Sequence, residues 1–301
     1  MHSRTSRWRT GISVLGIMAV VGAVGIGASA SVAGAGGSAK AIKPYKNSLS
    51  GNTKGWCTVA DGCSGAYNAS GTIDVVKASF SNFGGYGYGA PAPTGQKKFA
   101  RISGAPGLGF ADTPVTPATQ LNLNGCSRPG GEFCDGPYVI FGGGTDKTFP
   151  VAGFTSSIKL YIDDAWAEAN QGQVIDSDVS LNDNTGNYLV DNVFNLCATA
   201  TGWAVSDSQN AGGCNAGDVT LTTSGWYTFS ETFSQLNGVV YVTYNVLDSS
   251  GNSVWSTDHS VTNPGTGLPQ AAATTGGPNY YWLPDEDALG LPVADISLIQ
   301  N

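Results

Sequence analysis

The stretch "GVVYVTYNVLDSSGNSVW", residues 238–255, decides the fold class of this chain. With a period of two, Val240, Val242 and Val246 fall on one face of a strand, and Tyr241 falls on the other face with Thr and Asn neighbours. The segment "DSSGN" then supplies the residues of a tight turn before a return strand begins at Val254 and Trp255. The pattern predicts an antiparallel hairpin with one apolar face and one polar face.

Further strand-like runs precede and follow this hairpin at short, regular intervals. They are expected at residues 72–80, 98–103, 120–123, 138–141, 154–162, 174–181, 187–197, 218–222, 226–233, 280–283 and 293–299. Only "DDAWAEANQG", residues 163–172, favours a helix, of two turns at most. Short strands separated by turns indicate an all-β fold, an antiparallel sandwich with almost no helix in the exported protein. We expect one domain over residues 36–301, with a loop-rich part at 36–71.

The N-terminus has the three regions of an export signal. A basic start with Arg4, Arg7 and Arg9 precedes an uncharged apolar run, and the small-residue segment "ASASVAGAGG" follows it. Residues 1–35 are therefore expected to be a signal peptide, cleaved after Ala30 or Ala35. The alternative is an uncleaved membrane anchor, but no basic stop sequence follows the apolar run. We expect a freely secreted, extracellular protein, monomeric and without membrane attachment after cleavage.

Charge is distributed unevenly along the chain. The last basic residue is Lys159, and sixteen Asp and Glu residues lie between that point and the C-terminus. Such a surface repels nucleic-acid phosphates and anionic membranes, which excludes both as expected partners. It also repels uronate polysaccharides unless a divalent cation bridges them. A plain acidic, soluble exoprotein accounts for the same charge.

Six cysteines in an exported chain indicate disulfide bonds. Fifteen pairings of six cysteines are possible, and their clustering in sequence favours the pairing of consecutive ones. This gives Cys57 with Cys63, Cys126 with Cys134, and Cys197 with Cys214. A zinc site is the rival interpretation, but no His lies near any of these cysteines.

Four segments resemble the strands of secreted jelly-roll modules of the concanavalin and laminin-G type. They are "FTSSIKLYIDDAW", "SGWYTFSETF", "GVVYVTYNVLDSSGNSVW" and "LPVADISLI", within about residues 150–300. The resemblance implies a concave sheet that binds carbohydrate and a structural calcium ion. It also implies that an acidic residue near the last strand is a calcium ligand, which by position is Asp295. The acid excess after Lys159 suits a calcium ion, since calcium prefers oxygen ligands.

The sequence offers little catalytic chemistry. His259 is the only histidine of the exported chain, and no G-x-S-x-G motif is present. The E-x-D-x-x-E arrangement of jelly-roll glucanases is absent. Two acidic clusters remain as candidate carboxylate pairs, residues 163–168 and 285–287, and are also explained by a helix N-terminus and a solvated loop. A polysaccharide lyase would need cations that the C-terminal half lacks.

Aromatic residues beside polar ones are the remaining candidates for a binding surface. Tyr241, Trp255, Tyr280 and Trp282 are expected to stack on sugar rings while neighbouring polar groups fix the orientation. Ordinary core packing is the competing interpretation for each of them. The Gly- and aromatic-rich loop at residues 81–93, which includes Tyr86, is expected to cap the core.

These observations predict a non-catalytic exoprotein that binds neutral glycan or a cell-surface component. The alternative is an extracellular glycoside hydrolase or lyase with paired carboxylates in a groove. An aromatic strip without paired acids favours binding, and converging acids favour the enzyme.

Overall fold

The structure is a computed structural model, and it describes eleven segments of the chain. These are residues 44–57, 72–77, 86, 90–103, 138–140, 153–182, 188–214, 217–236, 239–260, 280–282 and 290–301. All of them belong to a compact unit that spans Ala39–Asn301. The predicted signal peptide, the expected strand at 120–123 and the acidic cluster at 285–287 lie outside the described residues.

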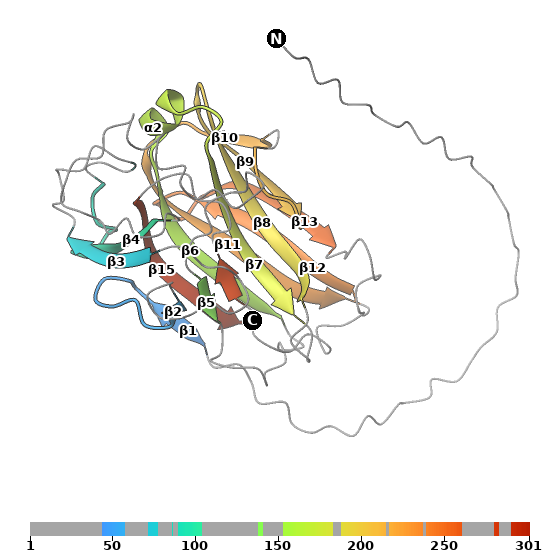
Figure 1. The fold of residues 1–301 in the computed structure, drawn as a ribbon. Coiled ribbons are helices and arrows are strands. Elements are labelled where there is room, and N and C mark those ends of the chain that lie inside the picture. The colour runs from blue at the N-terminus through green and yellow to red at the C-terminus, as the bar shows by residue number, and fades with distance from the viewer. Residues whose placement is uncertain are drawn as a thin grey trace, which may run out of the picture. The chain divides into compact units, whose positions relative to one another are not determined.

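Two antiparallel sheets form a sandwich, which confirms the predicted fold class (Figure 1). One sheet has eight strands in the order β13-β12-β11-β6-β15-β4-β3, with β1 paired to β15. The other has seven strands in the order β10-β9-β8-β7-β14-β5-β2. Neighbouring strands are often distant in sequence, since β15 at the C-terminus pairs with both β4 and β6.

Most strands lie where the sequence predicts them, but β1, β2 and β9 lie in segments for which the sequence analysis expects no strand. The eight-stranded sheet contains β1 (Tyr45–Asn47), β3 (Thr72–Lys77), β4 (Lys98–Ser103), β6 (Phe154–Ile162), β11 (Gly225–Leu236), β12 (Val239–Leu247), β13 (Ser253–Ser260) and β15 (Leu291–Gln300). The seven-stranded sheet contains β2 (Trp56–Cys57), β5 (Tyr138–Ile140), β7 (Val174–Asn182), β8 (Tyr188–Thr199), β9 (Gly202–Gln209), β10 (Val219–Leu221) and β14 (Tyr280–Trp282).

The hairpin of β12 and β13 forms as the sequence predicts. The turn is held by the Asp248 side chain, whose Oδ1 accepts hydrogen bonds from the backbone N–H groups of Ser250 at 2.8 Å and Asn252 at 2.9 Å. Gly251 adopts a φ of 85°, a left-handed conformation that favours glycine. The register shifts between Val246 and Leu247, so a bulge precedes the turn.

The core lies between the sheets and receives apolar side chains from both. Phe194 of β8 contacts the ring edges or faces of Phe229, Tyr244 and Trp255 from the opposite sheet, at centroid distances of 5.3, 5.0 and 6.2 Å. The apolar face predicted for β12 is confirmed, because Val242, Tyr244 and Val246 are completely buried. Such burial is the main term that stabilises a sandwich of this size.

A short helix and an aromatic cluster close one end of the core. Helix α2 (Asp164–Ala169) is the predicted two-turn segment, and it begins at Asp163, whose side chain accepts a hydrogen bond from Trp166 N at 3.0 Å. Tyr86 is fully buried between Trp166 and Trp203, which confirms the expected core cap for this residue of the 81–93 loop. None of the helices among the described residues is long and apolar enough to span a membrane.

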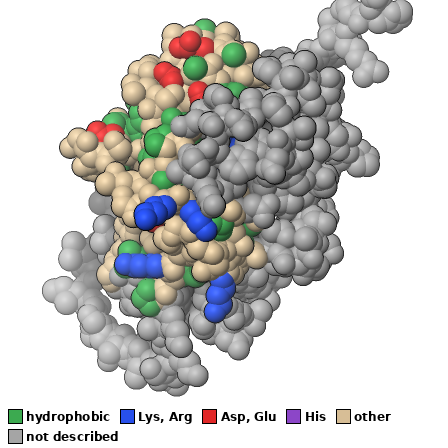
Figure 2. All heavy atoms as spheres, turned by 90° about the vertical axis from the view of Figure 1, so that its left-hand side faces the viewer, with side chains coloured by type: hydrophobic (Ala, Val, Ile, Leu, Met, Phe, Trp, Pro, Cys, Tyr) green, Lys and Arg blue, Asp and Glu red, His purple; other side chains and the backbone are tan. Residues whose placement is uncertain are grey.

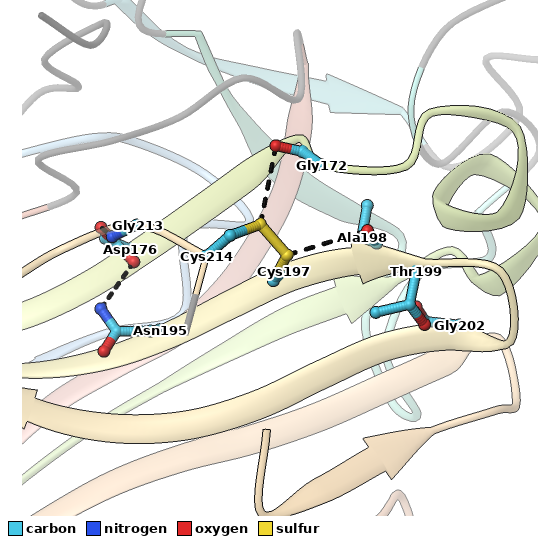
Figure 3. The surroundings of a disulfide bond; sticks show 9 residues. All are labelled: Gly172, Asp176, Asn195, Cys197, Ala198, Thr199, Gly202, Gly213 and Cys214. Atoms are coloured by element: carbon cyan, nitrogen blue, oxygen red, sulfur yellow. Dashed lines mark hydrogen bonds between the residues drawn. A yellow bond between two sulfur atoms is a disulfide. The ribbon is translucent and has the colours of Figure 1, made fainter. Parts of the chain in front are cut away.

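One of the three predicted disulfides is present among the described residues. Cys197 of β8 is bonded to Cys214, which follows β9, as predicted (Figure 3). The side chains of the other four cysteines, Cys57, Cys63, Cys126 and Cys134, are outside the described residues. The pairing of those four stays a prediction.

Candidate functional site

The outward side of β12 is the polar surface that the sequence predicts around Tyr241. Tyr241, Thr243 and Asn245 are each half-buried, and they alternate with the fully buried Val242 and Tyr244. The seven-stranded sheet covers the opposite side of β12, where Tyr244 donates a hydrogen bond from its hydroxyl to Ser208 O of β9 at 3.2 Å. Tyr241 therefore lies on the side of its sheet that faces away from the core.

Hydroxyl and amide groups extend this surface across four strands. The strand registers place Thr155, Thr232, Thr243 and Asp258 in one row, and Ser157, Ser230, Asn245 and Ser256 in the next. We call these eight residues together with Tyr241 the hydroxyl face. All nine are half-buried or exposed, so the hydroxyl face is accessible from outside the sandwich.

Several side chains of the hydroxyl face form hydrogen bonds with each other or with a neighbouring residue. The hydroxyl oxygens of Thr155 and Thr232 lie 3.0 Å apart across β6 and β11. At the turn, Ser253 donates from its Oγ to Asn245 Oδ1 at 2.6 Å. These bonds fix side-chain orientations before any ligand arrives, which lowers the entropy lost on binding.

The hydroxyl face carries few charges. Asp258 lies at one edge strand, and Lys159 of β6 lies on the same side of the sheet, opposite Thr228. The sequence contains no Lys or Arg after Lys159, so β11, β12 and β13 add no cation to this surface. Lys159 of β6 is the exception on this side of the sheet. The Nζ of Lys159 lies 2.7 Å from Asp295 Oδ2, and this ion pair offsets its charge.

Exposed lysines gather elsewhere on the molecule. Figure 2 shows a group of Lys and Arg side chains and, apart from it, a group of Asp and Glu side chains. The exposed lysines of the described N-terminal segments are Lys46, Lys54, Lys97 and Lys98. On the face drawn in Figure 2, these basic and acidic side chains are thus separated in space.

Trp255 does not share the surface of Tyr241. It pairs with Val246 in the register of β12 and β13, which places it on the core side of the sheet. Its side chain is half-buried, packs against the core and contacts the Phe194 ring. The structure therefore separates these two predicted binding residues by the thickness of a sheet.

Tyr280 and Trp282 belong to β14 of the other sheet. This strand pairs with β5 and β7, and Trp282 lies opposite Asp178 in the register. The structure thus does not bring the four predicted binding residues into one surface. Tyr241 alone lies on the hydroxyl face.

Asp295, the predicted calcium ligand, occupies a bulge in β15. The register with β6 shifts between Ala294 and Ser297, and Asp295 has a φ of 47°. Its carboxylate accepts a hydrogen bond from Gln96 Nε2 at 2.6 Å in addition to the Lys159 contact. Among the described residues, no three His, Cys, Asp or Glu side chains lie close enough to hold a metal ion. Calcium at Asp295 stays a prediction.

His259 contacts a carboxylate across the sandwich. Its Nε2 lies 2.8 Å from Asp207 Oδ2 of β9, and the only hydroxyl described beside it, on Thr257, lies 3.5 Å from the same nitrogen. A catalytic triad needs the acid and the nucleophile on different ring nitrogens. This arrangement is therefore not a triad. Burial raises the pKa of Asp207, and the nearby His259 partly offsets that rise.

Sequence reasoning missed an acidic group on β7. Asp176 and Asp178 alternate in "VIDSDVSL", and the register places Asp191 of β8 opposite Ser180. A search for the E-x-D-x-x-E pattern does not find this shorter D-x-D sequence. A search for acidic residues at every second position of a strand would have found it. Both aspartates are completely buried on the side of the sheet opposite to Ile175 and Val179, which belong to the core.

The loop after β9 covers part of this acidic group. The Asp176 carboxylate accepts hydrogen bonds from Gly213 N at 2.7 Å and from Asn195 Nδ2 at 2.9 Å (Figure 3). The Cys197–Cys214 disulfide ties the same loop to β8. Asp176 and Asp178 are therefore enclosed, while Asp191 is half-buried, which differs from two carboxylates in an open groove.

No protein-family model and no curated protein matches the sequence. Among solved structures, the metal-free carbohydrate recognition domain of Emp46p is similar with 8% identity and a TM-score of 0.37, over 85% of this chain and 96% of that one. A point mutant of the same domain gives 8% identity and a TM-score of 0.31, over 56% and 79%. A sialidase gives 12% identity and a TM-score of 0.25, over 56% of this chain and 14% of that chain.

Proposed function

We propose that the protein is a secreted, non-catalytic β-sandwich that binds neutral glycan, or an adhesive cell-surface component of that chemistry, on the hydroxyl face. The observation that carries the proposal is the position of Tyr241, half-buried beside Thr243 and Asn245 on the outward side of β12. An aromatic ring stacks on the apolar face of a sugar, and the neighbouring hydroxyl and amide groups bond to its hydroxyls.

Charge supports a neutral ligand over an acidic one. The strands β11–β13 contribute no Lys or Arg, and Lys159 of β6 is already paired with Asp295. A uronate or sulfate group would therefore meet no free cation among the described residues of the hydroxyl face. A shallow, open surface supports modest affinity, with Kd in the micromolar to millimolar range, or roughly 4–8 kcal/mol.

The enzyme alternative remains open to test, because Asp178 and Asp191 both contact Ser180. The burial of Asp178 favours binding without turnover, since a substrate would have to reach this fully buried side chain. Release of reducing sugar by the purified protein, lost in Asp191→Asn, would favour the hydrolase instead.

A glycan array and sedimentation with insoluble polysaccharides test the proposal. Tyr241→Ala should weaken retention at least about tenfold, equivalent to about 1.4 kcal/mol, and Tyr241→Phe should keep most of it because the ring remains. Thr220→Ala on β10 is the matched control, since Thr220 is exposed on the other sheet. Retention unchanged in Tyr241→Ala, or no retention by the wild type, would refute the proposal.

A further inference from the structure

One serine hydroxyl lies between two carboxylates in the acidic group of β7 and β8. Ser180 Oγ is 2.5 Å from Asp191 Oδ1 and 3.2 Å from Asp178 Oδ1. A hydroxyl carries a single proton and donates it to one acceptor. Ser180 therefore cannot donate to both carboxylates, and the second contact is a hydrogen bond only if Asp178 or Asp191 holds a proton and donates it to Ser180 Oγ.

The surroundings of Asp178 disfavour its ionised form. Its side chain is completely buried, and Oδ2 has no hydrogen-bond partner among the described residues. The acidic groups whose charges act on it are Asp191 on β8, Glu231 on β11 of the opposite sheet and Asp176 on its own strand. An ionised carboxylate enclosed with other carboxylates is costly, and a protonated one is not.

Glu231, on the core side of β11, is a second buried carboxyl group. It is 2% exposed, and its Oε2 has no hydrogen-bond partner among the described residues. Its strand neighbours in the register are Ser156 and Tyr244, neither of which is a cation. Each of these two buried carboxyl groups thus has an oxygen without a hydrogen-bond partner in the described part of the chain, which disfavours its ionised form.

We propose that Asp178 and Asp191 hold one proton through Ser180, that Glu231 holds another, and that the fold is therefore built to work in an acidic external medium. Burial is the first cause that raises the pKa of Asp178 well above its ordinary value, and the carboxylates of Asp191, Glu231 and Asp176 raise it further. Burial followed by Asp191 raises the pKa of Glu231 in the same direction. No cation of the described residues is among the groups that act on either carboxyl.

The sign of the pH dependence follows from these raised values. Above the ordinary pKa of a carboxyl group, about 4, the unfolded chain loses these protons while the folded chain keeps them. The folded form then binds more protons than the unfolded form, so stability falls as pH rises. The stabilisation is complete below the unfolded pKa and disappears as pH passes through the raised, folded pKa.

Thermal unfolding of the full secreted protein between pH 3.5 and 8 tests the inference. We expect the wild-type Tm to be highest at the acidic end and to fall by at least about 5 °C toward pH 8. Asp178→Asn, which imitates the protonated acid, should flatten that fall and exceed the wild-type Tm at pH 8. Asp258→Asn is the matched control: it removes the same charge from an exposed position of β13 and should leave the pH slope unchanged.

Infrared spectroscopy provides a readout that does not depend on any variant folding. The folded wild type at pH 7 should show the carbonyl stretch of protonated carboxyl groups, a band that ionised carboxylates lack. A Tm that rises from pH 4 to 8, no protonated-carboxyl band at pH 7, or equal slopes for Asp178→Asn and Asp258→Asn would each overturn the inference.

Discussion

Lys159 and Asp295 form an ion pair at 2.7 Å across β6 and β15, so the last basic residue of the chain contacts the predicted calcium ligand. Their side chains are 36% and 32% exposed. A partly exposed pair contributes little, and we expect a coupling energy below about 1 kcal/mol. A double-mutant cycle with Lys159→Met and Asp295→Asn, measured by urea unfolding, gives this value directly. A coupling of several kcal/mol would contradict the expectation.

The calcium prediction is tested on the same pair. If Asp295 is a ligand, EDTA should lower the Tm of the wild type but not that of Asp295→Asn. The ammonium group of Lys159 competes with a cation for the same carboxylate. Lys159→Met should therefore increase the calcium-dependent rise in Tm. A wild-type Tm that EDTA leaves unchanged decides against calcium at this site.

The disulfide between Cys197 and Cys214 should contribute about 3 kcal/mol to the free energy of unfolding. The bond joins two cysteines with a sequence separation of 17. Closing a loop of this size lowers the conformational entropy of the unfolded chain by an amount equivalent to about 3 kcal/mol. The double variant Cys197→Ala, Cys214→Ala measures the loss by chemical denaturation. Wild-type stability in this variant would show that the hydrogen bonds of Gly213 and Asn195 to Asp176 hold the loop alone.

The hydrogen bond that caps helix α2 at Asp163 contributes to stability at one end of the helix, and a single substitution can remove it. Its Oδ1 accepts the N–H of Trp166, and Asp163→Ala leaves that donor without this partner. We expect a loss of about 1 kcal/mol, within the usual range for an N-cap. Asp163→Asn retains the accepting oxygen and serves as the control, with most of the stability kept. Equal losses in the two variants would mean that the charge, and not the hydrogen bond, is responsible.

Most strands could be predicted because their period-two pattern depends on neighbouring residues only, whereas β9 (Gly202–Gln209) was missed. The hairpin at β12 and β13 and the alternation of Val242 with Tyr241 both follow from residues 238–255. The disulfide at Cys197 was also predictable, since consecutive cysteines lay close in sequence.

The grouping of the candidate site was harder to predict, because it depends on long-range pairing. Nothing within "NYYWLP" states that Tyr280 and Trp282 enter the seven-stranded sheet beside β7. The sequence analysis predicts Trp255 to be a surface residue. The strand register instead places it opposite Val246, on the core side of the sheet. Ser180 and Asp191 meet only through the register of β7 and β8. The side of a strand on which a residue lies can thus be predicted from its neighbours in sequence. The residues that it meets on that side depend on strand pairing and cannot.

Tyr241 and Trp255 should respond in opposite ways to truncation, because they lie on opposite sides of one sheet. Trp255 packs half-buried against the core beside Phe194, so Trp255→Ala should cost about 2 kcal/mol of unfolding free energy, roughly half the value for a fully buried Trp. Tyr241 lies on the outward side, and Tyr241→Ala should change stability by less than about 1 kcal/mol. Urea unfolding of both variants, with glycan retention measured on the same samples, separates stability from binding. A large stability loss in Tyr241→Ala would mean that this ring is part of the packing and that the hydroxyl face owes its shape to it.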